Sequence, residues 1–154
     1  MDKSIYEKYL VRKPLYELFP GIKNRQSPAM TFISNAQIPG AGYCLYYSWI
    51  YGNPEPNPPV AEEVYDTEKI ILYFGGDSED PEDLGAEIEF RIGGQSLTFS
   101  KSAGLYVPRG VRHSAVWKKF KKPHVEMVLI PGDGPDKAGS AGSLPIYWRW
   151  HSCK

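Results

Sequence analysis

Glycine and proline interrupt this chain so often that long helices have little room in it. The 154 residues include 15 glycines and 14 prolines. Glycine is costly inside helices and strands, and proline lacks the backbone N–H that a helix interior or a central strand requires, so both collect in turns. Apolar residues still make up 42% of the chain and aromatic residues 14%, which is enough to build a core. We therefore predict one domain made of many short strands joined by many turns.

The charges of the chain are balanced, which excludes several kinds of partner. It holds 18 basic and 18 acidic residues, so the formal net charge is zero. Nucleic-acid and anionic-membrane binding usually need a basic surface, so we expect neither partner. Cys44 and Cys153 are too few for a disulfide framework, and no apolar stretch typical of a secretory signal is found near Met1. We expect a cytoplasmic protein.

The pattern from residue 30 onward is that of β-strands. Residues 85–92 alternate between apolar and charged side chains, as in a half-buried strand, and Gly93-Gly94 predicts a hairpin to residues 95–100. The four prolines within residues 53–59 predict a loop. The spacing of about 8–12 residues between strands favours a sandwich or barrel. Further strands are predicted at 30–33, 42–51, 64–74, 104–107, 112–118, 124–130 and 144–150.

Both ends of the chain differ from this pattern. We predict an N-terminal arm over 1–24, a barrel over 25–131, and a flexible linker with a C-terminal aromatic strand over 132–154. The last strand carries Leu144, Ile146, Trp148 and Trp150 on one face. That face needs burial against the chain's own barrel or against a neighbour, and we expect a homodimer.

Residues 104–113 combine a tight turn with a histidine. In Gly-Leu-Tyr-Val-Pro-Arg-Gly-Val-Arg-His, the turn at Pro108 and Gly110 precedes a strand that begins near His113. This segment resembles the second half of the cupin signature, and residues 83–94 look like the hairpin region that precedes it. The resemblance covers about residues 25–131, and small bacterial single-domain cupins are the most similar group. It implies an all-β cupin double-stranded β-helix, which is a jelly-roll barrel.

The first half of the cupin signature is replaced in this chain. In most cupins it supplies His-x-His and a Glu, which hold a divalent metal together with the later His. Neither register of this half contains a histidine. Counted back from Gly76 the three positions are Glu63, Tyr65 and Lys69, and counted back from Gly75 they are Glu62, Val64 and Glu68. We prefer the first register, because the related group places its His pair ten and twelve residues before the glycine that matches Gly75.

The preferred register changes the chemistry that the resemblance implies. Lys69 stands where an anionic ligand is expected, and an ammonium repels a divalent metal and has no lone pair. We expect Lys69 to pair with Glu63 in place of a metal, and we expect no cofactor. The alternative is a weak divalent-metal site on Glu63 and His113, which Tyr65 would join as a phenolate. A plainer interpretation makes His113 a core imidazole and Lys69 a surface residue.

His124 and Glu126 lie two residues apart on one face of the strand after His113. This face either looks into the same cavity as His113 or points outward, with Val125 and Met127 facing inward. In the first case the imidazole and the carboxylate could act as acid and base.

Two classes of function follow from these residues. The first is a small-molecule binding protein whose metal-free pocket, lined by Tyr65, Lys69, His113 and Glu126, takes a small anionic ligand such as a carboxylate. The alternative is a cupin enzyme of the isomerase, decarboxylase or dioxygenase type that acts on a small organic acid or phenol, with or without a metal. His113 would then be the general acid or base, and Lys69 an electrostatic stabiliser. The loss of metal ligands without a replacement constellation favours binding, while the fold alone sets no reaction.

Overall fold

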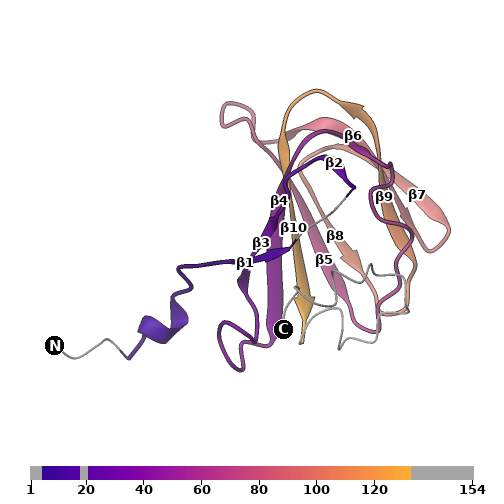
Figure 1. Ribbon diagram of the computed structural model, residues 1–154. Coiled ribbons are helices and arrows are strands. Elements are labelled where there is room, and N and C mark those ends of the chain that lie inside the picture. The colour runs from indigo at the N-terminus through magenta and orange to yellow at the C-terminus, as the bar shows by residue number, and fades with distance from the viewer. Residues whose placement is uncertain (1–4, 18–20, 133–154) are drawn as a thin grey trace.

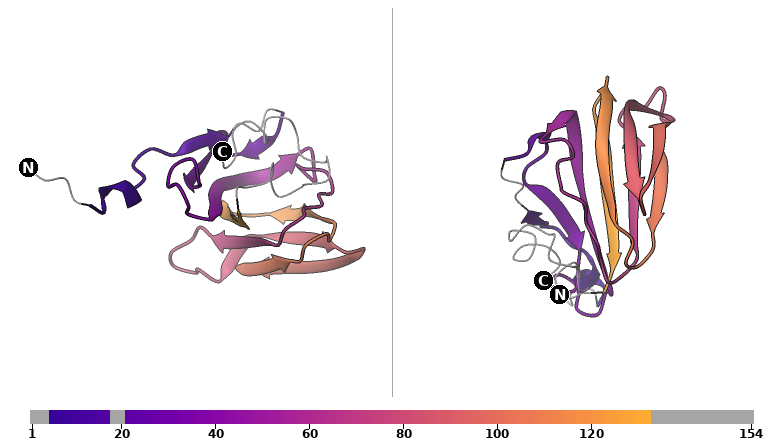
Figure 2. Two further views of the ribbon diagram at one scale, coloured as in Figure 1. Left: turned by 90° about the horizontal axis from the view of Figure 1, so that it is seen from below. Right: turned by 90° about the vertical axis from the view of Figure 1, so that its right-hand side faces the viewer.

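The protein consists of two antiparallel β-sheets that pack face to face, as the computed structural model shows for residues 5–17 and 21–132 (Figures 1 and 2). A single 3₁₀ turn, η1 (Glu7–Tyr9), precedes the strands. The larger sheet holds β1 (Leu15–Glu17), β2 (Lys23–Arg25), β3 (Ala29–Ile33), β4 (Tyr43–Glu55), β5 (Lys69–Gly75), β8 (Ala103–Val107) and β10 (His124–Pro131). The smaller sheet holds β6 (Asp83–Ile92), β7 (Gln95–Lys101) and β9 (His113–Phe120).

The path of the chain through these sheets is that of a jelly roll. After β4 the chain touches the smaller sheet through a single bridge between Glu63 and His113, and then returns to the larger sheet as β5. The hairpin β6–β7 lies in the smaller sheet, β8 in the larger, β9 in the smaller and β10 in the larger. As a result β10 lies between β4 and β5, and β9 lies beside β6. Two sheets that exchange strands in this order confirm the predicted all-β, cupin-type jelly-roll fold.

Most predicted strands are present, and two boundaries are corrected. Gly93 and Gly94 have φ angles of 55° and 80°, the left-handed conformation that a tight hairpin between β6 and β7 requires. The predicted strand 64–74 begins only at Lys69, because the residues before it cross from one sheet to the other. β4 continues to Glu55, into the loop predicted for 53–59. Its extension pairs with β2, so part of the predicted N-terminal arm belongs to the larger sheet.

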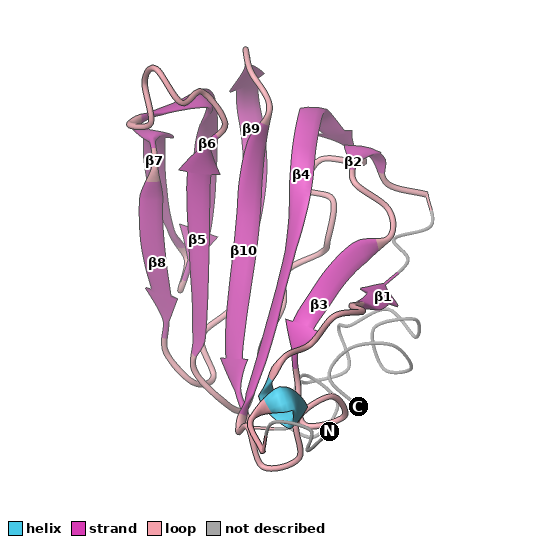
Figure 3. Ribbon diagram, turned by 90° about the vertical axis from the view of Figure 1, so that its left-hand side faces the viewer, coloured by secondary structure: helices cyan, strands magenta, loops and turns pink. Residues whose placement is uncertain are grey.

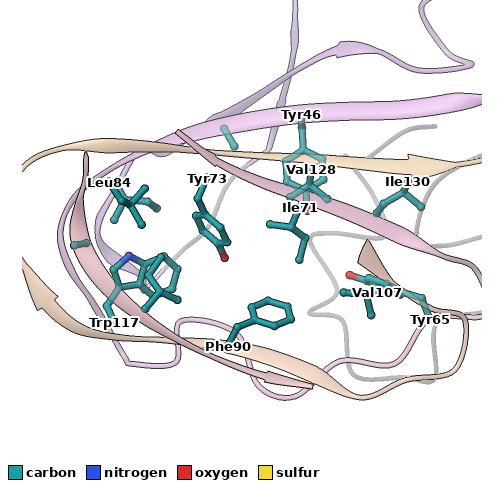
Figure 4. Packing of buried hydrophobic residues seen from close by; sticks show 14 of the residues in the cluster. Tyr46, Tyr65, Ile71, Tyr73, Leu84, Phe90, Val107, Trp117, Val128 and Ile130 are labelled. Atoms are coloured by element: carbon teal, nitrogen blue, oxygen red, sulfur yellow. The ribbon is translucent and has the colours of Figure 1, made fainter. Parts of the chain in front are cut away.

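The core lies between the sheets (Figure 4). Tyr73 and Val128 project from the larger sheet toward Phe90 and Trp117 of the smaller one, and the rings of Tyr73 and Trp117 meet edge to face with centroids 6.1 Å apart. Burial of each such side chain stabilises the fold by roughly 1.5–3 kcal/mol.

Cys44 is fully buried on β4, as expected for a core residue. It also takes part in a disulfide bond, which the sequence analysis did not predict. Cys153 and the predicted strand 144–150 lie outside the described residues. Among the described residues no helix is long or apolar enough to span a bilayer, and the cytoplasmic location stays a prediction.

Candidate ligand-binding cavity

A small cavity opens between the two sheets, with a volume of about 50 Å³. It therefore has room for a few water-sized groups, since one water needs about 10–15 Å³ by this measure, and it is far below the roughly 300–1,000 Å³ of a drug-sized pocket. Aromatic and aliphatic side chains form much of its wall. The polar groups belong to two clusters, one around Lys69 and one around Arg25.

The first cluster joins His113 to two side chains of the preferred register, Glu63 and Lys69. Lys69 Nζ donates to Glu63 Oε2 at 2.9 Å and lies 3.4 Å from His113 Nε2. Glu63 reaches this position through its bridge to His113, whereas Lys69 is the first residue of β5. All three side chains are almost inaccessible to solvent. The predicted strand 64–74 would have carried most of this group, but the chain brings these residues together by crossing between the sheets.

Two aromatic rings, those of Tyr65 and Phe90, pack against this cluster. Tyr65 donates from its hydroxyl to Glu63 Oε2 at 3.1 Å, and its ring centre lies 4.7 Å from Lys69 Nζ. Phe90 stacks on the His113 ring with centroids 6.0 Å apart. Tyr65 is buried but is not among the described residues that line the cavity. Its predicted contact with a ligand stays a prediction, while its contacts with Glu63 and Lys69 are direct.

The hydrogen bonds of His113 define its tautomer. Nδ1 lies 3.1 Å from the carbonyl oxygen of Val111, and a carbonyl oxygen only accepts, so Nδ1 carries the proton. The Lys69 ammonium has no lone pair and only donates, so Nε2, 3.4 Å from Lys69 Nζ, faces it with its lone pair. The Lys69 ammonium thus bridges two acceptors, the Glu63 carboxylate and the neutral imidazole, in the way that a bound cation would.

The electrostatics of Glu63 follow from the same contacts. Burial by itself would raise the pKa of this carboxyl. The charge of Lys69 and its hydrogen bond, together with the nearby His113 ring, outweigh burial and lower the Glu63 pKa to about 2. The carboxylate is therefore ionised at neutral pH and compensates the charge of Lys69.

The residues present do not fit a divalent metal. Glu63 and His113 supply two donor atoms 3.5 Å apart, and the ammonium that lies against both is a cation without a lone pair. No group of three or more His, Cys, Asp or Glu side chains suited to a metal exists within residues 5–17 and 21–132. The donor chemistry therefore favours the ammonium over a metal at this position.

The second cluster lies farther along the cavity wall. Arg25 Nη2 donates to Glu126 Oε1 at 2.9 Å, and both side chains are buried. Burial, and then the negative charge of Glu126, raise the pKa of the neighbouring Tyr73 hydroxyl well above its ordinary value. Glu126 and Tyr73 sit opposite each other in the register of β10 and β5, while Arg25 comes from β2.

The structure distinguishes the two interpretations of His124 and Glu126. Both side chains face inward, and Val125 and Met127 lie on the opposite side of β10. Only Glu126 of the pair lines the cavity. His124 Nε2 accepts a hydrogen bond from Trp117 Nε1 at 3.0 Å, and burial lowers the His124 pKa. His124 is thus engaged in the core, and an acid–base pair with Glu126 has no support from this geometry.

Sequence reasoning missed one charged residue of the cavity, Arg25. The predicted boundary between arm and barrel fell beside it, and no motif surrounds it. Its pairing with Ile50 follows an irregular register in β2, where Lys23 is paired with Glu55. Only an isolated arginine between polar residues marked this position, and that signal is too common to identify a buried site.

Comparison with solved structures gives partial similarity at low identity. An oxalate oxidase in complex with the substrate analogue glycolate matches with a TM-score of 0.49 and 13% identity, over 75% of this chain and 54% of that chain. The polyketide cyclase RemF from Streptomyces resistomycificus gives 0.48 and 16%, over 85% and 80%. A cupin-2 domain, Rru_A2000 from Rhodospirillum rubrum, gives 0.49 and 9%, over 75% and 66%.

This chain therefore spans about half the length of the oxalate oxidase that it matches. No sequence-family model matches the chain, and no curated protein matches it by sequence. These similarities assign no function to the cavity.

Proposed function

We propose that the chain binds a small organic acid or phenol in a cavity that works without a metal. One observation carries this proposal: the Lys69 ammonium lies 2.9 Å from Glu63 Oε2 and 3.4 Å from His113 Nε2. A cation held in this way fills the electrostatic place of a metal with a group that can donate hydrogen bonds to a ligand. The cavity volume of about 50 Å³ limits the ligand to a few heavy atoms unless side chains move.

The charges of the wall narrow the class of ligand further. Lys69 and Arg25 are donors only, and each has one buried carboxylate partner, so the two clusters together carry no net charge while His113 is neutral. A ligand in the cavity therefore has a cation in each of the two clusters that line it. A dianion would have to be buried without full compensation, which is costly. Monocarboxylates and phenols therefore fit better than strongly charged anions.

An enzyme that uses no metal is the second candidate, and the tautomer of His113 favours it. Nε2 carries a lone pair next to the Lys69 ammonium, so a proton could pass between a ligand and this pair of groups. Lys69 would also stabilise negative charge that develops on a ligand oxygen. His113 would be the general base, and the reaction class would be set by the ligand.

A thermal-shift titration of the full-length protein without an affinity tag tests ligand binding. The panel comprises formate and acetate, which suit the volume of the cavity, and pyruvate and phenol, which require side chains to move. A ligand at 100 times its dissociation constant should stabilise the fold by about 2.7 kcal/mol. NMR of the same mixtures would show whether any compound is turned over, which would favour the enzyme.

Two variants make this test specific. The double substitution Lys69→Met with Glu63→Gln removes both charges of the first cluster and should abolish the shift. Lys122→Met removes a half-exposed lysine that pairs with Asp77 outside the cavity and should retain it. A shift that persists in the double variant, or no shift with any compound, would contradict the proposal.

Metal analysis tests the other half of the proposal. The purified chain should hold no stoichiometric zinc, manganese, iron or nickel, and should gain none on titration. A stoichiometric metal that is lost on His113→Ala would show that Glu63 and His113 hold a metal after all.

A further inference from the structure

The seven-stranded sheet, whose strands Figure 3 shows side by side, has an outer face with apolar side chains across its width. The register of the strands arranges its outward side chains in three rows that run across the sheet. The central row is Tyr16, Met30, Tyr47, Met127, Leu72 and Gly104. The rows on either side of it are Trp49, Val125 and Phe74, and Leu45, Leu129, Ile70 and Tyr106. None of these thirteen residues carries a charge, and none is buried in the described structure.

The outer face of the smaller sheet is built in the opposite way. Glu89 accepts from Arg91 Nε at 2.9 Å and lies 2.9 Å from Lys118 Nζ. Thr98, opposite Glu89 in the register of β6 and β7, is exposed. The outer face of the smaller sheet is therefore polar, as expected for a surface in contact with water. The outer face of the larger sheet has the apolar composition of a surface that is covered.

The area of this apolar face reaches the size of a protein–protein interface. Trp49, Phe74, Tyr106 and Tyr16 are 39%, 42%, 61% and 56% exposed. At about 150–250 Å² per full aromatic side chain, these four alone present roughly 400 Å². The half-buried Met, Leu, Ile and Val side chains between them extend the face toward the roughly 800 Å² that each partner contributes to a standard interface.

We propose that a second copy of this chain covers the outer face of the seven-stranded sheet. A twofold interface places the same patch on both sides, so a charged patch would meet its own charge, whereas an uncharged one does not. The net charge of the chain is zero, which adds no long-range repulsion between copies. A second copy also presents an apolar face of the same width, so it can cover all three rows at once. This proposal does not depend on the ligand.

Sedimentation velocity of the full-length, untagged chain tests this inference. The wild type should sediment at twice the chain mass of 17.4 kDa across a wide concentration range. Met127→Lys places a charge at the centre of the face and should weaken the dimer about a hundredfold or more, because two unpaired ammonium groups would be buried per dimer. Phe74→Lys, at a side chain that is already 42% exposed, should do the same if Met127→Lys fails to fold.

Thr98→Lys is the matched control, because it adds the same charge to the outer face of the other sheet and should leave the dimer intact. A wild-type dimer that withstands both Met127→Lys and Phe74→Lys would overturn the proposal, because another surface would then form the dimer. A monomeric wild type would also overturn it. Loss of thermal stability in a monomeric Met127→Lys variant, but not in Thr98→Lys, would then point to residues 133–154 of the same chain as the cover.

Discussion

The two buried ion pairs of the cavity have the same length but different origins. Lys69 and Glu63 lie six residues apart in the chain, whereas Arg25 and Glu126 lie 101 apart, and both pairs meet at 2.9 Å. Burying an ion pair costs about as much as it returns, so stability alone gives no reason for either. The imidazole of His113 also contacts the first pair, and the phenol of Tyr73 contacts the second. The difference suggests that the ammonium replaces a cation at the site, while the guanidinium ties β2 to the sheet.

Substitution of Lys69 by an acid should give the largest effect. Lys69→Glu would place a second carboxylate beside Glu63 and His113, so the free protein should unfold at a lower temperature than with any neutral residue at this position. The three donors would suit a divalent metal, and zinc should restore the stability. Differential scanning calorimetry with and without zinc measures both effects. The corresponding change Arg25→Glu should be destabilising without rescue, and rescue of both variants or of neither would contradict the assignment of Lys69 to the place of a cation.

Removal of one partner from either pair should have the next largest effect on the free energy of unfolding. Lys69→Met and Arg25→Met should each lower the free energy of unfolding by about 3–5 kcal/mol, because each leaves an unpaired buried carboxylate. Urea unfolding measures both. The double variants Lys69→Met with Glu63→Gln and Arg25→Met with Glu126→Gln should recover most of this loss. Equal losses in the single and double variants would mean that packing, rather than the unpaired charge, causes them.

The fall of the unfolding free energy at acidic pH should depend on the pair of Lys69 and Glu63. The pKa of Glu63 is about 2 in the folded protein and 4.5 as the reference, so its contribution is complete above pH 4.5 and is lost as the pH falls toward 2. The loss amounts to roughly 3 kcal/mol, and Glu63→Gln should flatten the curve of unfolding free energy in this range. Glu89, whose pKa is also about 2, provides the control on the surface. High salt should reduce the effect of Glu89→Gln more than that of Glu63→Gln, because exposed pairs are screened.

The contrast between the pairs also explains what the sequence could and could not predict. The resemblance to the cupin signature, carried by Pro108 and Gly110 and by the spacing from Gly76, selected Glu63, Tyr65, Lys69 and His113 as one group. Spacing alone left the register from Gly75 open as well. The inward face of Glu126 remained open, because the wholly apolar side of β10 lies on the outer face of the sheet while the side with His124 and Glu126 faces inward, the reverse of the usual pattern. Arg25 was beyond reach, since its place depends on a long-range pairing that no local pattern encodes.

The smallest effect should come from Tyr73, which sharpens the description of the second pair. Tyr73→Phe removes a hydroxyl beside Glu126 and should lower the unfolding free energy by about 1 kcal/mol at neutral pH. Since the folded pKa of Tyr73 lies above the reference value of 10, its contribution is complete below pH 10 and is lost as the pH rises further. The wild type should therefore lose stability at alkaline pH faster than Tyr73→Phe, as urea unfolding at several pH values would measure. Parallel curves would contradict the raised pKa of Tyr73 and with it the burial of this hydroxyl beside Glu126.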